Sequence, residues 1–327
     1  MRVGVRVETA WTIGQQLEYV REAERLGFDI AWVEGNAFKS EPFSTAGYLA
    51  AQTSRIELGV AIAAVYMMHP VLIASAAATL DDLTGGRFIM GLGCSSVLAT
   101  DRLGLDTRPL QWMREGLACV RALLAGGPAS YEGEVFSLRN VSVTRAKRPL
   151  PLFVAAEGPK MQELAGELGD GWIIATAGDG YNQASIRAVE AGLAKSGRAR
   201  ASFRSVAYTR LWTLESPSEE LPMLRPVTSR LLARISPAAW KHMGIEGETA
   251  RRIAGDPGAA PESLIRELIF TGDREAVARR ARELAAQGFD ELVLESSAVT
   301  QLPMDTQYQH YSEMMRRFGE QVLPELR

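Results

Sequence analysis

Apolar residues recur along the chain in two patterns. Short continuous apolar runs, as in Phe28–Glu34, are typical of strands covered on both faces, while apolar residues three or four apart, as in Gln15–Arg25, are typical of amphipathic helices. Eight strands are predicted, at Val3–Val7, Phe28–Glu34, Arg55–Ile62, Arg87–Leu92, Leu150–Ala156, Gly171–Thr176, Ala201–Leu214 and Phe289–Ser296. Helices are predicted at Gln15–Arg25, Pro70–Leu83, about Leu110–Leu124 and from about Pro159. Strands alternating with helices indicate an α/β fold with a parallel sheet, and eight is the number that closes into a (β/α)8 TIM barrel.

A weak internal repeat supports this barrel. Glu24–Glu34 and Ala285–Glu295 each run from a helix end through a GFD turn and an apolar strand to a terminal glutamate. Such similarity is expected of equivalent units around one barrel.

The segment Leu58–Leu80 is nearly uncharged and about as long as the ~20 residues of a membrane span. However, His69 and Pro70 lie in its middle, and proline is favoured in the first turn of a helix but disfavoured inside one. The segment therefore predicts a buried strand before His69 and a helix that begins at Pro70.

Two segments interrupt the alternation. Residues 129–146 predict a hairpin after the fourth helix, and residues 216–261 predict a helical insertion before the last strand and helix unit. We expect both to be loop-end insertions in a single barrel domain, 1–327, where substrate selection often resides. For the second insertion, a dimerisation or lid role is an equal alternative.

Composition narrows the possible partners. The formal net charge is −3 without any run of like charge, which argues against nucleic acid or an anionic membrane as a partner and favours a small-molecule substrate. Cys94 and Cys119 are too few for a disulfide framework, and the chain start lacks the apolar core of a signal peptide. These features indicate a cytoplasmic protein.

Three glutamates lie at the carboxyl ends of predicted strands, where the active site of a barrel is built. Glu8, Glu34 and Glu295 could each supply a proton to a reacting atom, since an apolar barrel mouth raises the pKa of a carboxyl group. Alternatively, each pairs with a neighbouring arginine or caps the next helix. Glu34 is the preferred catalytic candidate.

The strand that ends at Ala156 leads into the best candidate anion site. Gly158 frees the backbone, Pro159 opens a helix whose N-terminal N–H groups suit a phosphate, and Lys160 adds positive charge. An exposed lysine without a ligand is the alternative. In DDLTGGRFIMGLGCSS (Asp81–Ser96), Ser96 replaces the third glycine of a dinucleotide fingerprint, which argues against a simple nicotinamide site. No metal site is predicted, because the three histidines are scattered.

Four stretches of the chain are similar to a known family: LGFDIAWVEG, TSRIELGVAIAAVYMMHP, AAATLDDLTGGRFIMGLG and VAAEGPKMQELAGELGDGWI. Together they resemble the luciferase-like monooxygenase superfamily, and within it the F420-dependent oxidoreductases similar to methylenetetrahydromethanopterin reductase. The resemblance spans nearly the whole chain. It implies a flavin-like cofactor in the mouth of a bacterial-luciferase-like TIM barrel, often in a homodimer.

The resemblance also implies which residues bind the cofactor. A bulge with a non-prolyl cis bond, matching Ala61–Ile62, would back the ring, and two loops would hold the phosphate. The implied cofactor-binding residues are Ala61, Ile62, Ala63, Gly93, Cys94, Ser95, Ser96, Ala156, Glu157, Gly158, Pro159, Lys160 and Thr176. One departure is that Arg6 occupies the position matching a first-strand glutamate of the pterin reductases, with Glu8 two residues on, which argues against a pterin substrate.

The leading hypothesis is therefore hydride transfer by coenzyme F420 to or from a C=N, C=C or C=O bond. An FMN-dependent monooxygenase of the same family is the main alternative. A reductase that binds nicotinamide directly, or a non-catalytic cofactor-binding protein, is the second.

Overall fold

The computed structural model describes residues 1–36, 38–94, 100, 102–105, 108–143, 148–212, 221–234, 237–295 and 303–327. It forms two compact units. The larger unit consists of Gly4–Ile173 and Ala188–Ser205, and the smaller unit of Met1–Val3, Ile174–Arg187 and Val206–Arg327.

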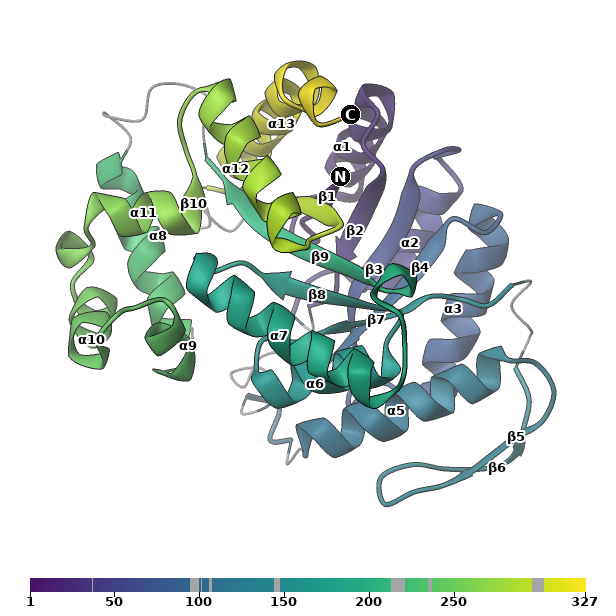
Figure 1. Cartoon of the computed structure of the whole chain (residues 1–327). Helices are drawn as coiled ribbons and strands as arrows, with labels where there is room; N and C mark the ends of the chain where they lie inside the picture. The colour runs from purple at the N-terminus through teal and green to yellow at the C-terminus, as the bar shows by residue number, and fades with distance from the viewer. Residues whose placement is uncertain are drawn as a thin grey trace. The chain divides into compact units, whose positions relative to one another are not determined.

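The larger unit is built on a parallel sheet (Figure 1). Across this sheet the strands are β1 (Arg2–Val7, from Gly4 onward), β2 (Ile30–Glu34), β3 (Glu57–Ala64), β4 (Phe88–Gly93), β7 (Leu152–Ala155) and β8 (Gly171–Ala175, up to Ile173). In register, Val5 lies beside Ala31 and Ala31 beside Leu58, and all three are fully buried. The apolar runs are thus covered on both faces, as parallel strands between layers require.

Helices follow these strands. They are α1 (Ile13–Leu26), α2 (Pro42–Ala50), α3 (Pro70–Thr84), α5 (Pro109–Leu124), α6 (Pro159–Leu168) and the C-terminal part of α7 (Asp179–Lys195), with a 3-10 turn η1 (Arg200–Ser202). Helix α3 packs against both α2 and α5. The sequence pattern missed α2 and α7. Helix α2 is only nine residues long, and contacts with α3 and β3 support it.

Local signals set the helix ends. Helix α1 begins with a capping box between Thr12 and Gln15 and ends at Gly27, whose φ of 89° is left-handed. At the start of α3, Nδ1 of His69 accepts the Val71 N–H at 3.3 Å, and Pro70 is the first helical residue. The predicted boundary at His69 and Pro70 is therefore confirmed.

A hairpin follows α5, where the sequence predicts one (Figure 1). Its antiparallel strands are β5 (Ala129–Glu132) and β6 (Ser137–Val141). The carboxylate of Glu115 on α5 is buried and accepts the N–H groups of Glu134, Val135 and Phe136, at 3.0, 2.9 and 2.9 Å. Burial by itself raises the pKa of Glu115, but these N–H groups outweigh it and lower the pKa. Glu115 thus fastens the hairpin turn to α5.

The smaller unit has three parallel strands, with β9 between the other two. They are β9 (Arg204–Leu211, of which Val206 onward belongs here), β10 (Ile269–Phe270) and β11 (Glu291–Glu295). The helices are α8 (Leu221–Arg234), α9 (Pro237–His242), α10 (Gly247–Gly255), α11 (Glu262–Leu268), α12 (Arg274–Gln287) and α13 (Met304–Gln321), with 3-10 turns η2 (Pro257–Ala259) and η4 (Leu323–Leu326). Strand β10 was not predicted, because two residues are too short for a pattern. Among the described residues, no helix is long and apolar enough to cross a membrane.

Candidate active site

Four charged side chains meet beyond the carboxyl ends of β1 and β2. Arg6 Nη2 lies 2.5 Å from Glu34 Oε1 and 3.4 Å from Glu8 Oε2. Lys39, in the loop after β2, places Nζ 2.8 Å from Glu34 Oε2 and also contacts Glu8 Oε1. We call Arg6, Glu8, Glu34 and Lys39 the charge cluster. It joins two cations to two carboxylates, so its formal charges balance.

Neighbouring polar groups hold the two carboxylates in place. Thr9 Oγ1 donates to Glu34 Oε2 at 3.3 Å, Asn36 Nδ2 donates to Glu34 Oε1 at 3.5 Å, and the Ala10 N–H donates to Glu8 Oε1 at 3.0 Å. The side chains of Glu8 and Glu34 are only 5% and 12% exposed, so their partners replace most of the lost water.

The ionisation of Glu34 differs from the sequence-based expectation. Burial raises its pKa, but the nearby charge of Arg6, with contributions from Glu8 and Lys39, outweighs burial and holds the pKa far below the ordinary 4.5. The predicted raised pKa is therefore wrong for Glu34. Glu34 is buried, but it pairs with Arg6, as in the alternative considered for each glutamate, and also with Lys39.

A bulge in β3 lies between two glycines. The register with β4 shifts between Ala61 and Ala63, and the Ala61–Ile62 peptide bond is cis, as predicted. A Cβ atom at Gly35 would lie 1.8 Å from the Ile62 carbonyl oxygen, and one at Gly93 would lie 2.9 Å from Ile62 Cδ1. At Gly35 the clash is with backbone, so only glycine leaves room there, whereas at Gly93 the end of the Ile62 side chain would have to shift.

Gly91 has a similar packing role, since a Cβ atom there would lie 2.6 Å from the Val60 carbonyl oxygen. Gly91 and Gly93 thus let β4 approach β3. Strand packing requires them, whether or not a ligand binds.

A pocket of about 210 Å³ opens beside this bulge. It is lined by Gly35, Asn36, Lys39, Glu41, Pro42, Phe43, Ile62, Ala63, Ala64, Met67 and Met68. Most of these residues are apolar, and Lys39 brings one end of the charge cluster to the wall. We call this space the β3 pocket. An apolar pocket with few polar groups is typical of a small-molecule site.

The second predicted loop also belongs to the larger unit. Ala156 is buried and accepts a hydrogen bond from Trp172 Nε1 at 2.9 Å, whereas Glu157, Gly158, Pro159 and Lys160 are exposed. Gly158 is the N-cap of α6 and supplies no side-chain cap, and Pro159 is the first helical residue. The start of α6 therefore presents backbone and a lysine to solvent, as an anion site needs.

The first predicted phosphate loop is only partly described. Gly93 ends β4, and Cys94 Sγ lies 3.4 Å from the Pro109 carbonyl oxygen. Burial raises the pKa of Cys94 to about 12, so the residue is a neutral thiol at physiological pH. Ser95 and Ser96 lie outside the described residues.

Two predicted residues belong to the smaller unit. Glu295 Oε1 lies 3.0 Å from Arg210 Nε, which is the pairing with arginine considered as an alternative for this residue. Arg210 Nη1 also donates to the Thr176 carbonyl oxygen at 3.0 Å, and Thr176 Oγ1 lies 3.2 Å from the Tyr208 carbonyl oxygen. Glu295 and Thr176 are thus linked through one buried arginine.

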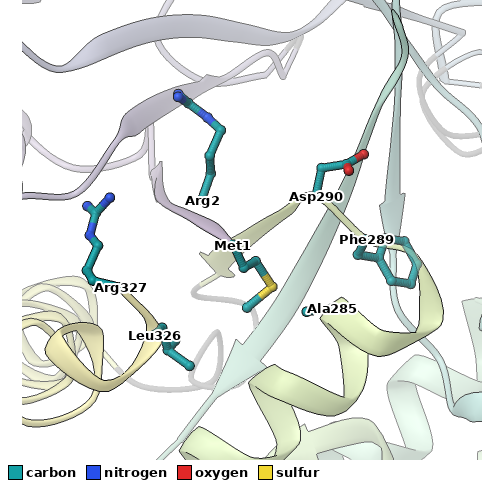
Figure 2. A pocket seen from close by; sticks show the side chains of 7 residues that line it. All are labelled: Met1, Arg2, Ala285, Phe289, Asp290, Leu326 and Arg327. Atoms are coloured by element: carbon teal, nitrogen blue, oxygen red, sulfur yellow. The ribbon is translucent and has the colours of Figure 1, made fainter. Parts of the chain in front are cut away.

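The smaller unit also contains a wider hollow of about 600 Å³, shown in Figure 2. It is lined by Met1, Arg2, Ala285, Phe289, Asp290, Leu326 and Arg327. Met1 and Arg2 lie at the beginning of β1, Phe289 and Asp290 just before β11, Ala285 on α12, and Leu326 and Arg327 at the end of η4. Barrel active sites are built at the opposite ends of the strands. We therefore place the candidate site at the β3 pocket.

Pairing with an arginine was an alternative for each glutamate, but Arg6 was not named as the partner and Lys39 was given no role. Lysine is rare in this chain, and Lys39 is five residues after Glu34, which is a weak signal available from the sequence. Within the described ranges, His, Cys, Asp and Glu side chains form no cluster suited to a metal ion.

Comparisons with known proteins agree on one family. Residues 1–291 match the model of the luciferase-like monooxygenases. The 5,10-methylenetetrahydromethanopterin reductase of Archaeoglobus fulgidus is 29% identical over 289 residues, covering 84% of this chain and 87% of that protein. The F420-dependent glucose-6-phosphate dehydrogenase of Kineococcus radiotolerans is 28% identical over 335 residues, covering 96% and 93%.

Solved structures show the same fold. The coenzyme F420 dependent tetrahydromethanopterin reductase from Methanopyrus kandleri superposes with a TM-score of 0.88 at 22% identity, covering 100% of this chain and 99% of that chain. An F420-dependent secondary alcohol dehydrogenase superposes with a TM-score of 0.78 at 18% identity, covering 100% and 99%. The predicted luciferase-like (β/α)8 barrel is confirmed.

Proposed function

Because the chain belongs to the luciferase-like monooxygenase family, we propose that it is an oxidoreductase that uses coenzyme F420. It transfers a hydride to or from a C=N, C=C or C=O bond of a small organic substrate. The names of similar proteins support the cofactor. One relative is an F420-dependent glucose-6-phosphate dehydrogenase, and the two similar solved structures are a coenzyme F420 dependent reductase and an F420-dependent secondary alcohol dehydrogenase.

The observation that carries the proposal is the β3 pocket, where an apolar wall lies beside the charge cluster. A flat aromatic ring suits a wall of Ile62, Ala63 and Ala64, and Gly35 and Gly93 leave the space in which this wall is formed. The exposed start of α6, with Lys160, suits the phosphate of the same cofactor. These residues fit a deazaflavin nucleotide.

We assign the cofactor contacts on that basis. Ala61, Ile62 and Ala63 would back the ring, while Gly93, Cys94, Ser95, Ser96 and the residues from Ala156 to Lys160 would hold the phosphate, with Thr176 as a further contact. When bound, the reduced deazaflavin supplies the hydride. The protein's own part is to orient the substrate, exclude water with its apolar wall and manage the proton.

The three glutamates remain the candidates for proton handling. Glu8 and Glu34 share Lys39 and Arg6, so they act as one unit, and an ionised Glu34 can orient its cationic partners or accept a proton. Glu295, with Arg210, is the third candidate. Since Arg6 stands where the pterin reductases have a glutamate, we propose a substrate other than a methylene-pterin.

We further propose that the chain forms one barrel domain over 1–327 with insertions at about 129–146 and 216–261, and that it works as a cytoplasmic homodimer. Tyr48 on α2 and Leu72 and Leu83 on α3 are large apolar residues with 42%, 59% and 52% of their surface exposed, which suits a subunit interface. Both cysteines are free thiols, as in reducing compartments.

Paired calorimetric titrations with F420 and FMN test the proposed function. Micromolar binding of F420 with little response to FMN supports the reductase. Preference for FMN, together with oxygen consumption, would instead support a monooxygenase, which is the activity that the family's description names. Binding of neither would contradict both.

A further inference from the structure

Lys39 is the charged residue through which the charge cluster reaches the β3 pocket. Its side chain is 25% exposed and lines the pocket, whereas the carboxylates of Glu8 and Glu34 are largely covered. An ammonium group carries three N–H donors. Glu8 and Glu34 accept two of them, so the geometry leaves one for a pocket ligand.

The other polar residues of the described pocket wall are already engaged. The Glu41 carboxylate caps α2 by accepting the N–H groups of Phe43 and Ser44 at 3.0 and 2.7 Å. Asn36 Oδ1 accepts the Phe38 N–H at 3.1 Å, and its Nδ2 donates to Glu34.

Of the other members of the charge cluster, Glu8 does not line the β3 pocket, and Glu34 and Arg6 are not suited to give a proton. Glu34 has no proton to donate near neutral pH, since Arg6 and Lys39 keep its carboxylate ionised. Arg6 is a guanidinium, which does not deprotonate in proteins. Lys39 combines a transferable proton with a place in the pocket wall.

We propose that Lys39, oriented by Glu8 and Glu34, is a catalytic residue that binds the heteroatom of the substrate's C=O or C=N bond and gives it a proton. This inference rests on the proposed function and narrows its substrate class. An isolated C=C bond has no lone pair for the ammonium group to bind, so carbonyl compounds and imines are the preferred acceptors.

The step balances. The hydride, with its two electrons, goes from the reduced deazaflavin to the carbon of the acceptor, and the π electrons of the double bond move to the oxygen or nitrogen. Lys39 Nζ transfers a proton to that atom, and the product is an alcohol or an amine. The neutral amine of Lys39 regains a proton from water through its exposed part. A fixed cation that meets developing negative charge is an efficient form of catalysis.

Lysine resonances test the contact directly, because the chain has only five lysines, namely Lys39, Lys147, Lys160, Lys195 and Lys241. The protein is labelled with 15N and 13C lysine, saturated with oxidised F420 and titrated with cyclohexanone, 1-pyrroline or methylenecyclohexane. The variant Lys39→Arg assigns the Lys39 signal. We expect a saturable shift of this signal with at least one of the two heteroatom probes and no comparable shift with the hydrocarbon. A signal that neither heteroatom probe moves, or that the hydrocarbon moves equally, overturns the inference.

Kinetics with the acceptor that binds provide the second readout. Lys39→Arg keeps the cation but has no transferable proton, so kcat should fall about 100-fold or more while KM changes little. In Lys39→Met, kcat should fall and the KM for the acceptor should also rise. The matched control is Lys195→Met, because Lys195 likewise contacts two glutamates, Glu163 and Glu167, outside the pocket. Its kcat should match the wild type.

Failure of this inference is distinguishable from failure of the proposed function. If Lys39→Met retains the wild-type kcat while F420 still binds, the proposed function stands and Lys39 is not catalytic. If the wild-type protein does not bind F420, the proposed function itself fails.

Discussion

A Cβ atom on Gly35 would lie 1.8 Å from the carbonyl oxygen of Ile62, while the Gly35 N–H already donates to the Ala61 carbonyl oxygen at 3.0 Å. The residue after β2 and the bulge of β3 are therefore fitted to each other through backbone atoms. Because both residues line the β3 pocket, this contact shapes the proposed ring-binding wall.

Gly35→Ala should destabilise the fold and damage the pocket together. The added methyl group meets backbone, which cannot rotate away, so the free energy of unfolding should fall by about 1–3 kcal/mol and F420 binding should weaken at least tenfold. Urea unfolding and calorimetry measure the two effects. Gly14→Ala is the control, since a Cβ atom there meets nothing within 4 Å and alanine favours a helix. Equal behaviour of the two variants would contradict the role of Gly35.

Glu34→Gln should remove a pH-dependent part of the stability. The folded-state pKa of Glu34 is lowered from the ordinary 4.5, so its ion pairs stabilise the fold fully above that pH and are lost as the pH falls toward the folded-state value. Near pH 7 the variant should be less stable by about 3 kcal/mol, because Arg6 and Lys39 lose one of the two carboxylates that they share. The difference from wild type should shrink in acid.

Urea unfolding at several pH values between neutral and strongly acidic checks this prediction. Glu190→Gln, at an exposed position of α7, is the matched control and should follow the wild-type profile. A loss in Glu34→Gln that stays constant with pH would mean that the ion pairs are not its source.

Glu115→Gln should loosen the hairpin while leaving the sheet intact. The amide offers one oxygen without a full charge to three backbone N–H groups, so about 1.5–3 kcal/mol of local stabilisation should be lost. Hydrogen exchange at Glu134, Val135 and Phe136 should quicken accordingly. In Glu132→Gln, an exposed change on β5, exchange at these amides should stay slow. If these three amides stay equally protected in Glu115→Gln, Glu115 does not fasten the hairpin turn to α5.

Lys160→Met should weaken F420 binding through charge alone. The lysine follows Gly158 and Pro159 at the start of α6, where the helix dipole and the ammonium group act together on a phosphate. A loss of about 1 kcal/mol of binding free energy corresponds to a roughly fivefold higher Kd. The difference in Kd between variant and wild type should shrink at high salt, because exposed charges are screened. Calorimetry at two salt concentrations measures this, and an unaltered Kd at low salt would place the phosphate elsewhere.

Leu72→Glu should favour the monomer. Leu72 is 59% exposed on α3, and a carboxylate buried at a subunit interface without a partner is costly. Sedimentation equilibrium compares this variant with Met223→Glu, which places the same charge at an exposed apolar position on α8. A wild-type protein that is monomeric at all concentrations would contradict the proposed homodimer.

Periodicity predicted most of the fold because each strand and helix carries its own signal. The eight predicted strands correspond to β1, β2, β3, β4, β7, β8, β9 and β11. The signal for the boundary at His69 and Pro70 is also local, because proline restricts its own backbone conformation. Helix α2 was not predicted because it is short and its support comes from packing against α3 and β3, outside its own segment.

The amino-acid sequence by itself thus determined the order of eight strands, the helices with a clear period, and the strand ends where polar residues gather. Only the tertiary structure decided that Arg6 and Lys39 meet Glu8 and Glu34, and that Gly35 meets Ile62. The physical reason is that Coulomb energy and steric contact depend on distance in space. The ionisation of Glu34 and the position of Lys39 in the pocket wall follow from those distances, which no pattern along the chain contains.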